Sequence, residues 1–363
     1  MSAAFVLAAG GTGGHLFPAE ALARQLAQTG AAVHLATDRR ADTFAADAPG
    51  ITTSRIQAGR IGADPLSAVV GIGQMALGIL QARRMLRRLD PEAVVGFGGY
   101  PSIPTLLAAT QLGFPTMIHE QNAVLGRANR FLAPHADALA LSFAETARVP
   151  SGARTVLTGN PVRPAVASIA PYAAPDEGGA LCLLVLGGSL GARVFSDVVP
   201  DAVAALPEAL RARLYVVQQC RAEDLERVGA AYARTGVPAK LAAFFPDVAA
   251  RLADAHMVIA RAGASTVAEL AVAGRPAILV PLPGAIDDHQ SANARALVDA
   301  GAAAMIAQSA LAAPVLAASL AALLDTPDRL GAMAAAARGQ ARPDAAQRLA
   351  DLIDTLIAQE ARA

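Results

Sequence analysis

The chain has 363 residues, with 30 lysines and arginines against 30 aspartates and glutamates, and therefore a formal net charge of zero. At about 150 residues per domain, this length predicts two domains, each large enough to bury its own core. The charge balance disfavours a general nucleic-acid-binding protein, which needs a basic excess, and also a disordered chain. The only cysteines, Cys182 and Cys220, offer neither a disulfide framework nor a CxxC metal site and fit a reducing cytoplasm.

Short apolar runs alternate with Gly/Pro-marked turns and Ala/Leu-rich segments of helical spacing, which is typical of βα units around a parallel sheet. The N-terminal run MSAAFVLAA lacks a positively charged segment and is interpreted as a first strand, not an export signal. Strands are predicted at residues 4–9, 33–37, 51–56, 93–97, 116–119, 138–141 and 155–157, and again at 181–186, 214–218, 241–244, 256–260, 277–280 and 303–306.

Two glycine-rich strand-to-helix turns, near residues 10–14 and 187–191, begin two similar series of elements. The sequence therefore predicts an α/β protein with two doubly wound domains in tandem. We place them at residues 1–161 and 162–342, because Pro and Gly replace the periodic pattern around the segment GNPVRP. A last helix within 343–363 is expected to join the first domain.

The first glycine turn, AGGTGGH at residues 9–15, places backbone N–H groups and the positive end of a helix dipole at the top of a sheet. It is not a dinucleotide fingerprint, because a third glycine is replaced by Leu16. It is not a Walker A loop either, because the only lysine of the chain is Lys240. A tight turn is the plainer alternative, but it does not explain four glycines in five residues.

A second glycine turn, LGGSLGAR at residues 186–193, repeats this arrangement. The motif RAGASTVAE, ending at Glu269, follows a strand and begins a helix that Ser265 or Thr266 is expected to cap. The carboxylate of Glu269 can accept both hydroxyls of a ribose, or it only complements the helix dipole.

The polar cluster PGAIDDHQSAN, residues 283–293, lies between a strand and a helix. Asp287, His289 and Gln290 could hydrogen-bond a sugar. The alternative is an ordinary helix N-terminus, which accounts for the aspartates but less well for Gln290.

The chain resembles the peptidoglycan N-acetylglucosaminyltransferases of glycosyltransferase family 28 in seven motifs that follow the family's order. They are GGTGGHLFPA (10–19), GFGGYPSIP (96–104), HEQNAVLGRAN (119–129), GNPVR (159–163), GGSLGAR (187–193), RAGASTVAEL (261–270) and DDHQSANA (287–294). The resemblance implies the GT-B fold, in which two Rossmann-like domains face a cleft. The first domain would face the acceptor and the membrane, and the second would bind UDP-GlcNAc.

The resemblance also implies the reaction: GlcNAc passes from UDP-GlcNAc to the C4 hydroxyl of MurNAc in undecaprenyl-diphosphoryl-MurNAc-pentapeptide (lipid I), with inversion, during peptidoglycan synthesis. No cofactor and no metal-binding motif is implied. The expected partners are UDP-GlcNAc, lipid I, an anionic membrane surface and other cell-wall synthesis enzymes, without nucleic acid. The expected location is peripheral, on the cytoplasmic face of the bacterial inner membrane, with a role in cell shape and division.

By the family pattern, donor-binding positions are spread over both domains. They are Thr12, Gly13, Gly14, Asn122, Arg163, Ser189, Phe245, Ala264, Ser265, Thr266, Val267, Ala268, Glu269 and Gln290. Arg163 would reach the donor from the hinge, the backbone of Phe245 would face uracil, and Gln290 would read the sugar. The chain departs from the family at Leu190, at Ser265 and in the segment QQCR (218–221).

Inversion requires a base that takes the acceptor proton and a group that stabilises the departing UDP. The helix N-termini at 187–192 and 263–266 would meet the diphosphate. His15 is the leading candidate base, because an imidazole suits proton transfer near neutral pH, and Glu120 is the rival. The plainer alternatives are a His15 that bonds a nearby loop, and His119 and Glu120 as satisfied structural groups.

The apolar run 66–80 is shorter than the roughly 20 residues that span a bilayer, and QARRMLRR follows it. Arginines at i and i+4 share a helical flank, so this segment is typical of a helix resting on an anionic membrane, or of a core helix with a solvated basic end. The expected membrane residues are Val69, Val70, Ile72, Leu77, Arg83, Arg84, Arg87 and Arg88.

Two other functions are compatible with paired Rossmann-like domains. One is a UDP-GlcNAc 2-epimerase, which would have no use for a basic and apolar membrane segment. The other is a non-catalytic nucleotide-sugar-binding scaffold of the cell-wall machinery.

Overall fold

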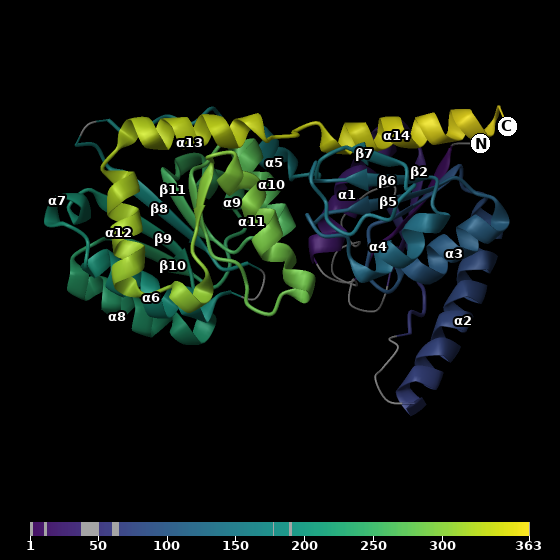
Figure 1. Ribbon diagram of the computed structural model, residues 1–363, viewed down its shortest axis with the longest axis horizontal. Coiled ribbons are helices and arrows are strands. Elements are labelled where there is room, and N and C mark those ends of the chain that lie inside the picture. Colours follow the sequence, from purple (N-terminus) through teal and green to yellow (C-terminus); the bar gives the residue numbers. More distant parts are fainter. Residues whose placement is uncertain are drawn as a thin grey trace. The chain divides into compact units, whose positions relative to one another are not determined.

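The computed structural model describes residues 3–10, 13–37, 51–59, 65–176, 178–188 and 191–362. The chain forms two compact units, the first made of Met1–Val162 with Arg342–Ala363 and the second of Arg163–Ala341 (Figure 1). Each unit has one parallel sheet with helices on both faces.

Among the described residues, the first unit has a seven-stranded sheet in the order β3-β2-β1-β4-β5-β6-β7. Its strands are β1 (Ala4–Ala8), β2 (Ala32–Thr37), β3 (Ile51–Arg55), β4 (Ala93–Gly96), β5 (Thr116–Glu120), β6 (Ala138–Leu141) and β7 (Thr155–Leu157). Its helices are α1 (Gly13–Gln28), α2 (Pro65–Leu89), α3 (Ser102–Leu112), α4 (Arg127–Leu132), the short 3-10 helix η2 (Ala133–His135) and α14 (Ala345–Glu360).

The second unit, over the same described part of the chain, has a six-stranded sheet in the order β10-β9-β8-β11-β12-β13. Its strands are β8 (Leu181–Leu186), β9 (Leu214–Gln219), β10 (Ala239–Ala242), β11 (Met257–Ala260), β12 (Ala277–Leu279) and β13 (Ala303–Met305). Its helices are α5 (Pro164–Ala167), α6 (Arg193–Ala204), α7 (Glu208–Arg211), α8 (Leu225–Thr235), α9 (Val248–Asp254), α10 (Ala264–Ala273), α11 (His289–Asp299), α12 (Ala313–Leu324) and α13 (Pro327–Gly339), with the 3-10 helices η3 (Ala222–Asp224), η4 (Ile286–Asp288) and η5 (Gln308–Ala310).

Both sheets contain the strand order 3-2-1-4-5-6 of doubly wound dinucleotide-type folds, counted within each unit. Their central strands are buried on both faces, which explains the nearly continuous apolar runs in the sequence. Two Rossmann-like domains, as the sequence predicts, are therefore confirmed.

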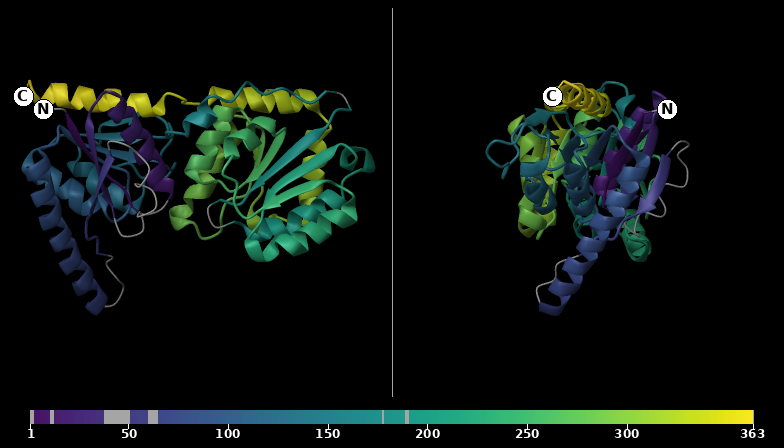
Figure 2. Two further views of the ribbon diagram at one scale, coloured as in Figure 1. Left: turned by 180° about the vertical axis from the view of Figure 1, so that it is seen from behind. Right: turned by 90° about the vertical axis from the view of Figure 1, so that its right-hand side faces the viewer.

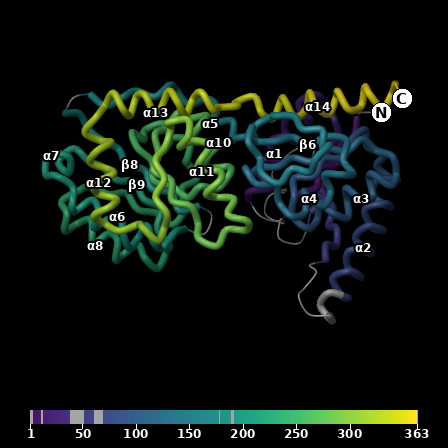
Figure 3. The backbone as a smooth tube through the Cα atoms, viewed as in Figure 1, coloured from purple at the N-terminus to yellow at the C-terminus, as the bar shows by residue number. Residues whose placement is uncertain are grey.

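Alternate residues of β1 face two separate cores of the first unit, because side chains alternate across a strand. Leu7 packs with residues of α1 and α14, such as Leu22 and Ile353, while Val6 packs with Leu86 of α2 and Leu106 of α3. Figure 3 shows the chain leaving the second unit after α13 and continuing as α14 in the first, where the views of Figure 2 place it along the sheet.

One strand boundary in the second unit differs from the prediction. We expected a strand at residues 241–244, whereas β10 is Ala239–Ala242 and pairs only with β9. The aromatic Phe244 suggested a strand by its β-propensity, but its side chain is 71% exposed in the loop after β10. The ends of an edge strand are set by hydrogen bonds to its single neighbour. Here the last backbone hydrogen bond between β9 and β10 runs from the amide of Cys220 to the carbonyl of Ala242.

Candidate active site

Four of the sequence motifs, at residues 9–15, 96–104, 186–193 and 261–270, lie at the positions where the two sheets reverse their strand order. In open α/β sheets, ligands bind outside the carboxyl ends of the strands at such switch points. In the first unit these are the loops after β1 and β4, and in the second the loops after β8 and β11.

The two loops of the first unit touch through glycine backbone. The amide of Gly10 donates to the carbonyl of Gly98 over 3.1 Å. A Cβ atom on Gly99 would lie 2.9 Å from the Cα of Gly10, and both Gly98 and Gly99 have positive φ angles of 92° and 78°. Side chains would therefore force the loops apart, which explains the glycines of GFGGY.

His15 lies in the first turn of α1, directly beside these loops. Its half-buried ring hydrogen-bonds the Oε1 atom of Gln121 through Nδ1, at 2.9 Å. Gly13 and Gly14 open the same helix, so their amides point toward its N-terminal end. Thr12, also predicted at this site, lies outside the described residues.

Glu120, at the end of β5, is a buried and heavily hydrogen-bonded carboxylate. Its Oε1 atom accepts from the amide and side chain of Asn122 at 2.9 and 3.2 Å. Its Oε2 atom accepts from the amide of Gly126 and the side chain of Asn129, both at 2.8 Å. Glu120 therefore ties together the loop that carries Asn122.

In the second unit, Gln219 fixes the glycine loop after β8. Its Oε1 atom accepts from the amide of Gly187 at 3.1 Å, and its Nε2 atom donates to the carbonyl of Gly188 at 3.0 Å. A Cβ atom on Gly187 would lie 2.3 Å from the amide of Ala192, so only glycine fits there. Ser189, predicted at this site, and Leu190 lie outside the described residues.

The helix that follows β11 begins differently from the prediction. Neither Ser265 nor Thr266 caps α10: its N-cap is Gly263, which has an extended backbone and no side chain to bond the helix. The residues from Ala264 to Ala268 form the first turns, and the buried Oγ atom of Ser265 has no hydrogen-bond partner within the described parts of the chain. The first amides of α10 are therefore not satisfied by a capping side chain.

Two predicted donor-binding residues contact each other. Arg163 donates from Nε and Nη2 to the two carboxylate oxygens of Glu269, at 2.7 and 2.8 Å. This bidentate geometry is the strong form of an Arg–carboxylate pair. Arg163 is the N-cap of α5, while Glu269 lies in α10, so the pair also joins these helices.

The two remaining donor candidates lie in loops and helices at the same sheet end. The ring of Phe245 is buried, with the guanidinium of Arg251 5.8 Å from its centroid, so only its backbone is suited to a ligand. The half-buried Gln290 of α11 accepts a bond from the amide of Leu282 at 2.9 Å through Oε1. Asp287 and Asp288 both have positive φ angles, which marks a strained turn before α11.

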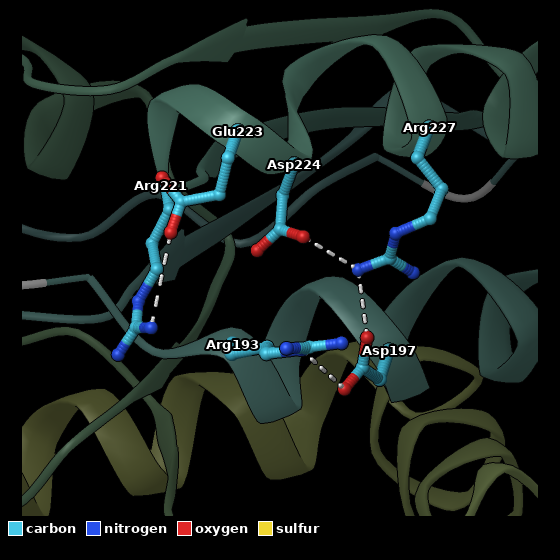
Figure 4. Close-up of polar contacts among 6 residues, drawn as sticks. All are labelled: Arg193, Asp197, Arg221, Glu223, Asp224 and Arg227. Atoms are coloured by element: carbon cyan, nitrogen blue, oxygen red, sulfur yellow. Dashed lines mark hydrogen bonds and ion pairs between the residues drawn. The ribbon is translucent and has the colours of Figure 1, made fainter.

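An ion-pair network that the sequence did not predict supports the helix after the second glycine loop (Figure 4). Arg227 of α8 bonds Asp197 of α6 at 2.7 Å and Asp224 at 2.8 Å. The bond from Arg227 lowers the pKa of the Asp224 carboxyl. Arg193, the first residue of α6, lies 3.7 Å from the same Asp197.

Arg261, directly after β11, begins the motif RAGASTVAE, but its role was not predicted. It donates to the carbonyls of Val280 and Pro281, both at 3.1 Å, and its guanidinium lies 5.2 Å from the ring centroid of Phe195. It therefore ties the loop after β11 to the end of β12. The sequence signal that could have identified this role is an arginine that directly follows a buried apolar strand.

The helix α2 carries the predicted membrane segment. Val69, Val70, Ile72, Leu77 and Leu80 are all more than half exposed, and Arg84, Arg87 and Arg88 are exposed beyond them on the same helix. We call these eight residues the α2 patch. Figures 1 and 2 show the N-terminal half of α2 extending away from the rest of the first unit.

Arg83 does not belong to this patch, because it turns to α3 and donates to the side chain of Gln111 at 2.6 Å. In the described part of the chain, we find no helix with the length and apolar character that crossing a membrane requires. The same residues contain no cluster of three or more His, Cys, Asp or Glu side chains that could hold a metal ion.

Comparison with known proteins identifies the class. The chain matches the glycosyltransferase family 28 N-terminal domain over residues 5–141 and the family 28 C-terminal domain over residues 182–349. Together with two Rossmann-like units that each carry a glycine-loop switch point, these matches define a glycosyltransferase of the GT-B architecture.

Individual relatives agree over nearly the full length. The chain is 54% identical to a UDP-N-acetylglucosamine--N-acetylmuramyl-(pentapeptide) pyrophosphoryl-undecaprenol N-acetylglucosamine transferase of Granulibacter bethesdensis, covering 96% of this chain and 92% of that protein. It is 55% identical to the transferase of the same name from a Methylobacterium species, covering 98% of each. The crystal structure of Acinetobacter baumannii MurG is similar with a TM-score of 0.82 and 35% identity, over 98% of this chain and all of that one. The chain belongs to glycosyltransferase family 28.

Proposed function

We propose that this protein transfers GlcNAc from UDP-GlcNAc to the C4 hydroxyl of MurNAc in undecaprenyl-diphosphoryl-MurNAc-pentapeptide, a step of peptidoglycan synthesis. The observation that carries the proposal is the identity of 51 to 55% over nearly the whole chain to relatives named for this transfer. The two units would supply what the reaction needs, which is an anion site for the leaving UDP and a base for the acceptor.

The donor would bind at the switch point of the second unit. Helices α6 and α10 begin there without a side-chain cap in the described part of the chain, at the ends of the glycine loop and of β11. Uncapped amides and two helix dipoles attract a diphosphate and stabilise the charge that develops as UDP departs. Gln219 would hold the backbone of Gly187 and Gly188 in place when the donor arrives.

The ribose would bind at Glu269. Each carboxylate oxygen has more than one acceptor site, so Glu269 can accept from a diol while Arg163 still holds it. Arg163 would thus keep the carboxylate oriented. Phe245 by its backbone and Gln290 by its amide would complete the contacts to uracil and sugar.

The base would be His15 in the first unit. A general base must reach the acceptor oxygen and have a lone pair available. Glu120 is buried and its two oxygens together accept four bonds, whereas the ring of His15 is half-buried at the rim of the glycine loops. This difference favours His15 over Glu120.

The α2 patch would rest on an anionic membrane that carries the lipid-linked acceptor. An exposed apolar face would enter the headgroup region, while the three exposed arginines would attract anionic lipids. The first unit would accordingly be the acceptor and membrane domain, and the second the UDP-GlcNAc domain. We place the protein on the cytoplasmic face of the bacterial inner membrane, where it would act with other cell-wall enzymes in cell shape and division.

One assay tests the proposal: purified protein is incubated with labelled UDP-GlcNAc and a water-soluble lipid I analogue, and products are separated. We expect labelled disaccharide-linked lipid and released UDP. An epimerised UDP-sugar would replace the proposal with a 2-epimerase, and donor binding without turnover would replace it with a non-catalytic scaffold.

A further inference from the structure

A continuous chain of hydrogen bonds runs through the first unit from buried backbone to His15. The Nε2 atom of His119 lies 3.0 Å from the carbonyl oxygen of Gly159. The Nδ1 atom of His119 lies 3.0 Å from the Nε2 atom of Gln121. The Oε1 atom of Gln121 then lies 2.9 Å from the Nδ1 atom of His15.

The direction of this chain is fixed at its buried end. A carbonyl oxygen only accepts, so the Nε2 atom of His119 must carry the hydrogen that bonds Gly159. A neutral imidazole has a single N–H, so the Nδ1 atom of His119 is an acceptor. Ser142 agrees, because its hydroxyl donates to the carbonyl of Glu120 at 2.8 Å and can accept from the same Nε2 atom at 3.3 Å.

A second contact fixes the orientation of the Gln121 amide independently. Its Nε2 atom lies 2.9 Å from the main-chain carbonyl of His119, which also only accepts. Both contacts place the NH₂ group toward His119 and the oxygen Oε1 toward His15. Since an amide oxygen has no hydrogen to donate, the Nδ1 atom of His15 must carry the hydrogen of that bond.

We propose that Gln121 is a positioning residue that, together with His119, holds neutral His15 as the Nδ1–H tautomer and so presents Nε2 as the proton-accepting nitrogen. The inference rests on the proposed function. In the transfer step, the proton of the acceptor hydroxyl moves to Nε2 of His15. The acceptor oxygen bonds the anomeric carbon, and the bond from that carbon to UDP breaks with its electron pair leaving on UDP. The resulting imidazolium keeps its Nδ1–H bond to Gln121.

Burial keeps the inner histidine in the required state. His119 has no exposed surface, and desolvation lowers its pKa to about 4, with the bond to Gly159 opposing and His15 contributing to that lowering. A second proton on Nδ1 of His119 would face the NH₂ group of Gln121, which is also a donor. The chain therefore keeps one direction at neutral pH.

The glycine loops keep the ring of His15 in place. A Cβ atom on Gly98 would lie 3.1 Å from Cε1 and 3.3 Å from Nδ1 of His15, so the imidazole packs directly on glycine backbone. His119 in turn meets the ring of Phe97 edge-on, with centroids 5.4 Å apart. Both rings are thus held by packing as well as by hydrogen bonds.

The direct test reads the tautomer without substrate. The whole protein is labelled with ¹⁵N-histidine, and the ring signals of His15 are assigned by comparison with His15→Asn among the six histidines of the chain. We expect the Nδ1–H pattern in the unsubstituted protein and a gain of the Nε2–H pattern in Gln121→Leu. The matched control Gln347→Leu, at an exposed position of α14 in the same unit, should leave the pattern unchanged.

Kinetics with the lipid I analogue add a second readout. Gln121→Leu should lower kcat by about tenfold to hundredfold, because part of the protein presents the wrong nitrogen, with KM for UDP-GlcNAc unchanged.

An Nε2–H His15 in the unsubstituted protein, or an unchanged tautomer and kcat in Gln121→Leu, would overturn this inference. If the unsubstituted protein nevertheless transfers GlcNAc to the lipid I analogue, the proposed function stands and only the inference on Gln121 fails. No transfer at all would refute the proposed function, and with it the positioning role of Gln121 in catalysis.

Discussion

The two switch points of this protein share a strand order and a glycine turn but differ in the groups placed beside them. In the first unit, the loops after β1 and β4 lie beside three hydrogen-bonded side chains, those of His15, Gln121 and His119. In the second, the loops after β8 and β11 lead into helices without side-chain caps in the described chain. One backbone design therefore presents titratable side chains in the first unit and uncapped helix amides in the second, according to the residues placed at the loops.

Charge follows the same division. The second unit contains the only lysine of the chain, Lys240, on the edge strand β10. In the proposed function, the attraction for a diphosphate would therefore come from backbone dipoles and from arginines such as Arg163. In the first unit, Arg84, Arg87 and Arg88 are exposed near the C-terminal end of α2, a helix without acidic residues, so a net charge of zero averages this basic helix with an acidic excess in the rest of the chain.

The largest effect is expected for the base itself. His15→Ala should lower kcat by about 10²- to 10⁴-fold, which is the usual contribution of general base catalysis. The check is steady-state transfer to the lipid I analogue. His135→Ala, at an exposed histidine of the same unit, is the control and should retain full activity. A normal kcat in His15→Ala would move the base role to another residue.

The buried His119 of the first unit should contribute a pH-dependent loss of stability. Because the pKa of His119 is lowered from 6.5 to about 4 in the folded protein, the unfolded chain binds a proton first as pH falls. The contribution of His119 to folding stability should therefore decline between pH 6.5 and pH 4, by about 3 kcal/mol in total, and level off below that range.

Urea unfolding at pH 7 and pH 4.5 measures this effect. His119→Gln should lose less stability between the two pH values than the unsubstituted protein, in which His34 and His256 also have lowered pKa values. The exposed-site control His135→Gln should keep the full difference. Equal losses in all three proteins would contradict the role of burial at His119.

A smaller effect is expected at the membrane. Reversing two charges of the α2 patch, Arg84→Glu with Arg88→Glu, should weaken binding to anionic vesicles by roughly tenfold or more, at about 1 kcal/mol per charge near the surface. Sedimentation with phosphatidylglycerol vesicles is the measurement. The double reversal of the exposed Arg234 and Arg329 in the second unit is the matched control. Full vesicle binding by the patch variant would remove the membrane assignment of α2.

Much of the fold was predictable because each buried strand leaves a continuous apolar run between turn residues. The edge strand β10 was the exception, since pairing with β9 and not the aromatic Phe244 sets its end. The positions of the glycine motifs were predictable for the same reason, because parallel strands end at one edge of a sheet.

The contacts within the site were not predictable. Arg163 and Glu269, like His15 and Gln121, are 106 residues apart in the chain, so their pairing depends on the fold and on side-chain rotamers. The prediction of a side-chain cap for α10 was wrong for a local reason. Gly263 is the extended N-cap residue, and Ser265 and Thr266 already lie inside the helix. Gln219 gave no composition signal, although a glutamine that ends a buried strand beside a glycine loop needs polar partners.

By the proposed function, the first unit would perform the proton transfer while the second would hold the donor. Calorimetric titration of UDP-GlcNAc into His15→Ala and Glu269→Ala proteins tests it directly. We predict an unchanged Kd for His15→Ala and a Kd raised by about tenfold or more for Glu269→Ala, since a hydrogen bond to a charged group contributes about 1.5–3 kcal/mol. Weakened binding in His15→Ala with normal binding in Glu269→Ala would contradict this division of roles.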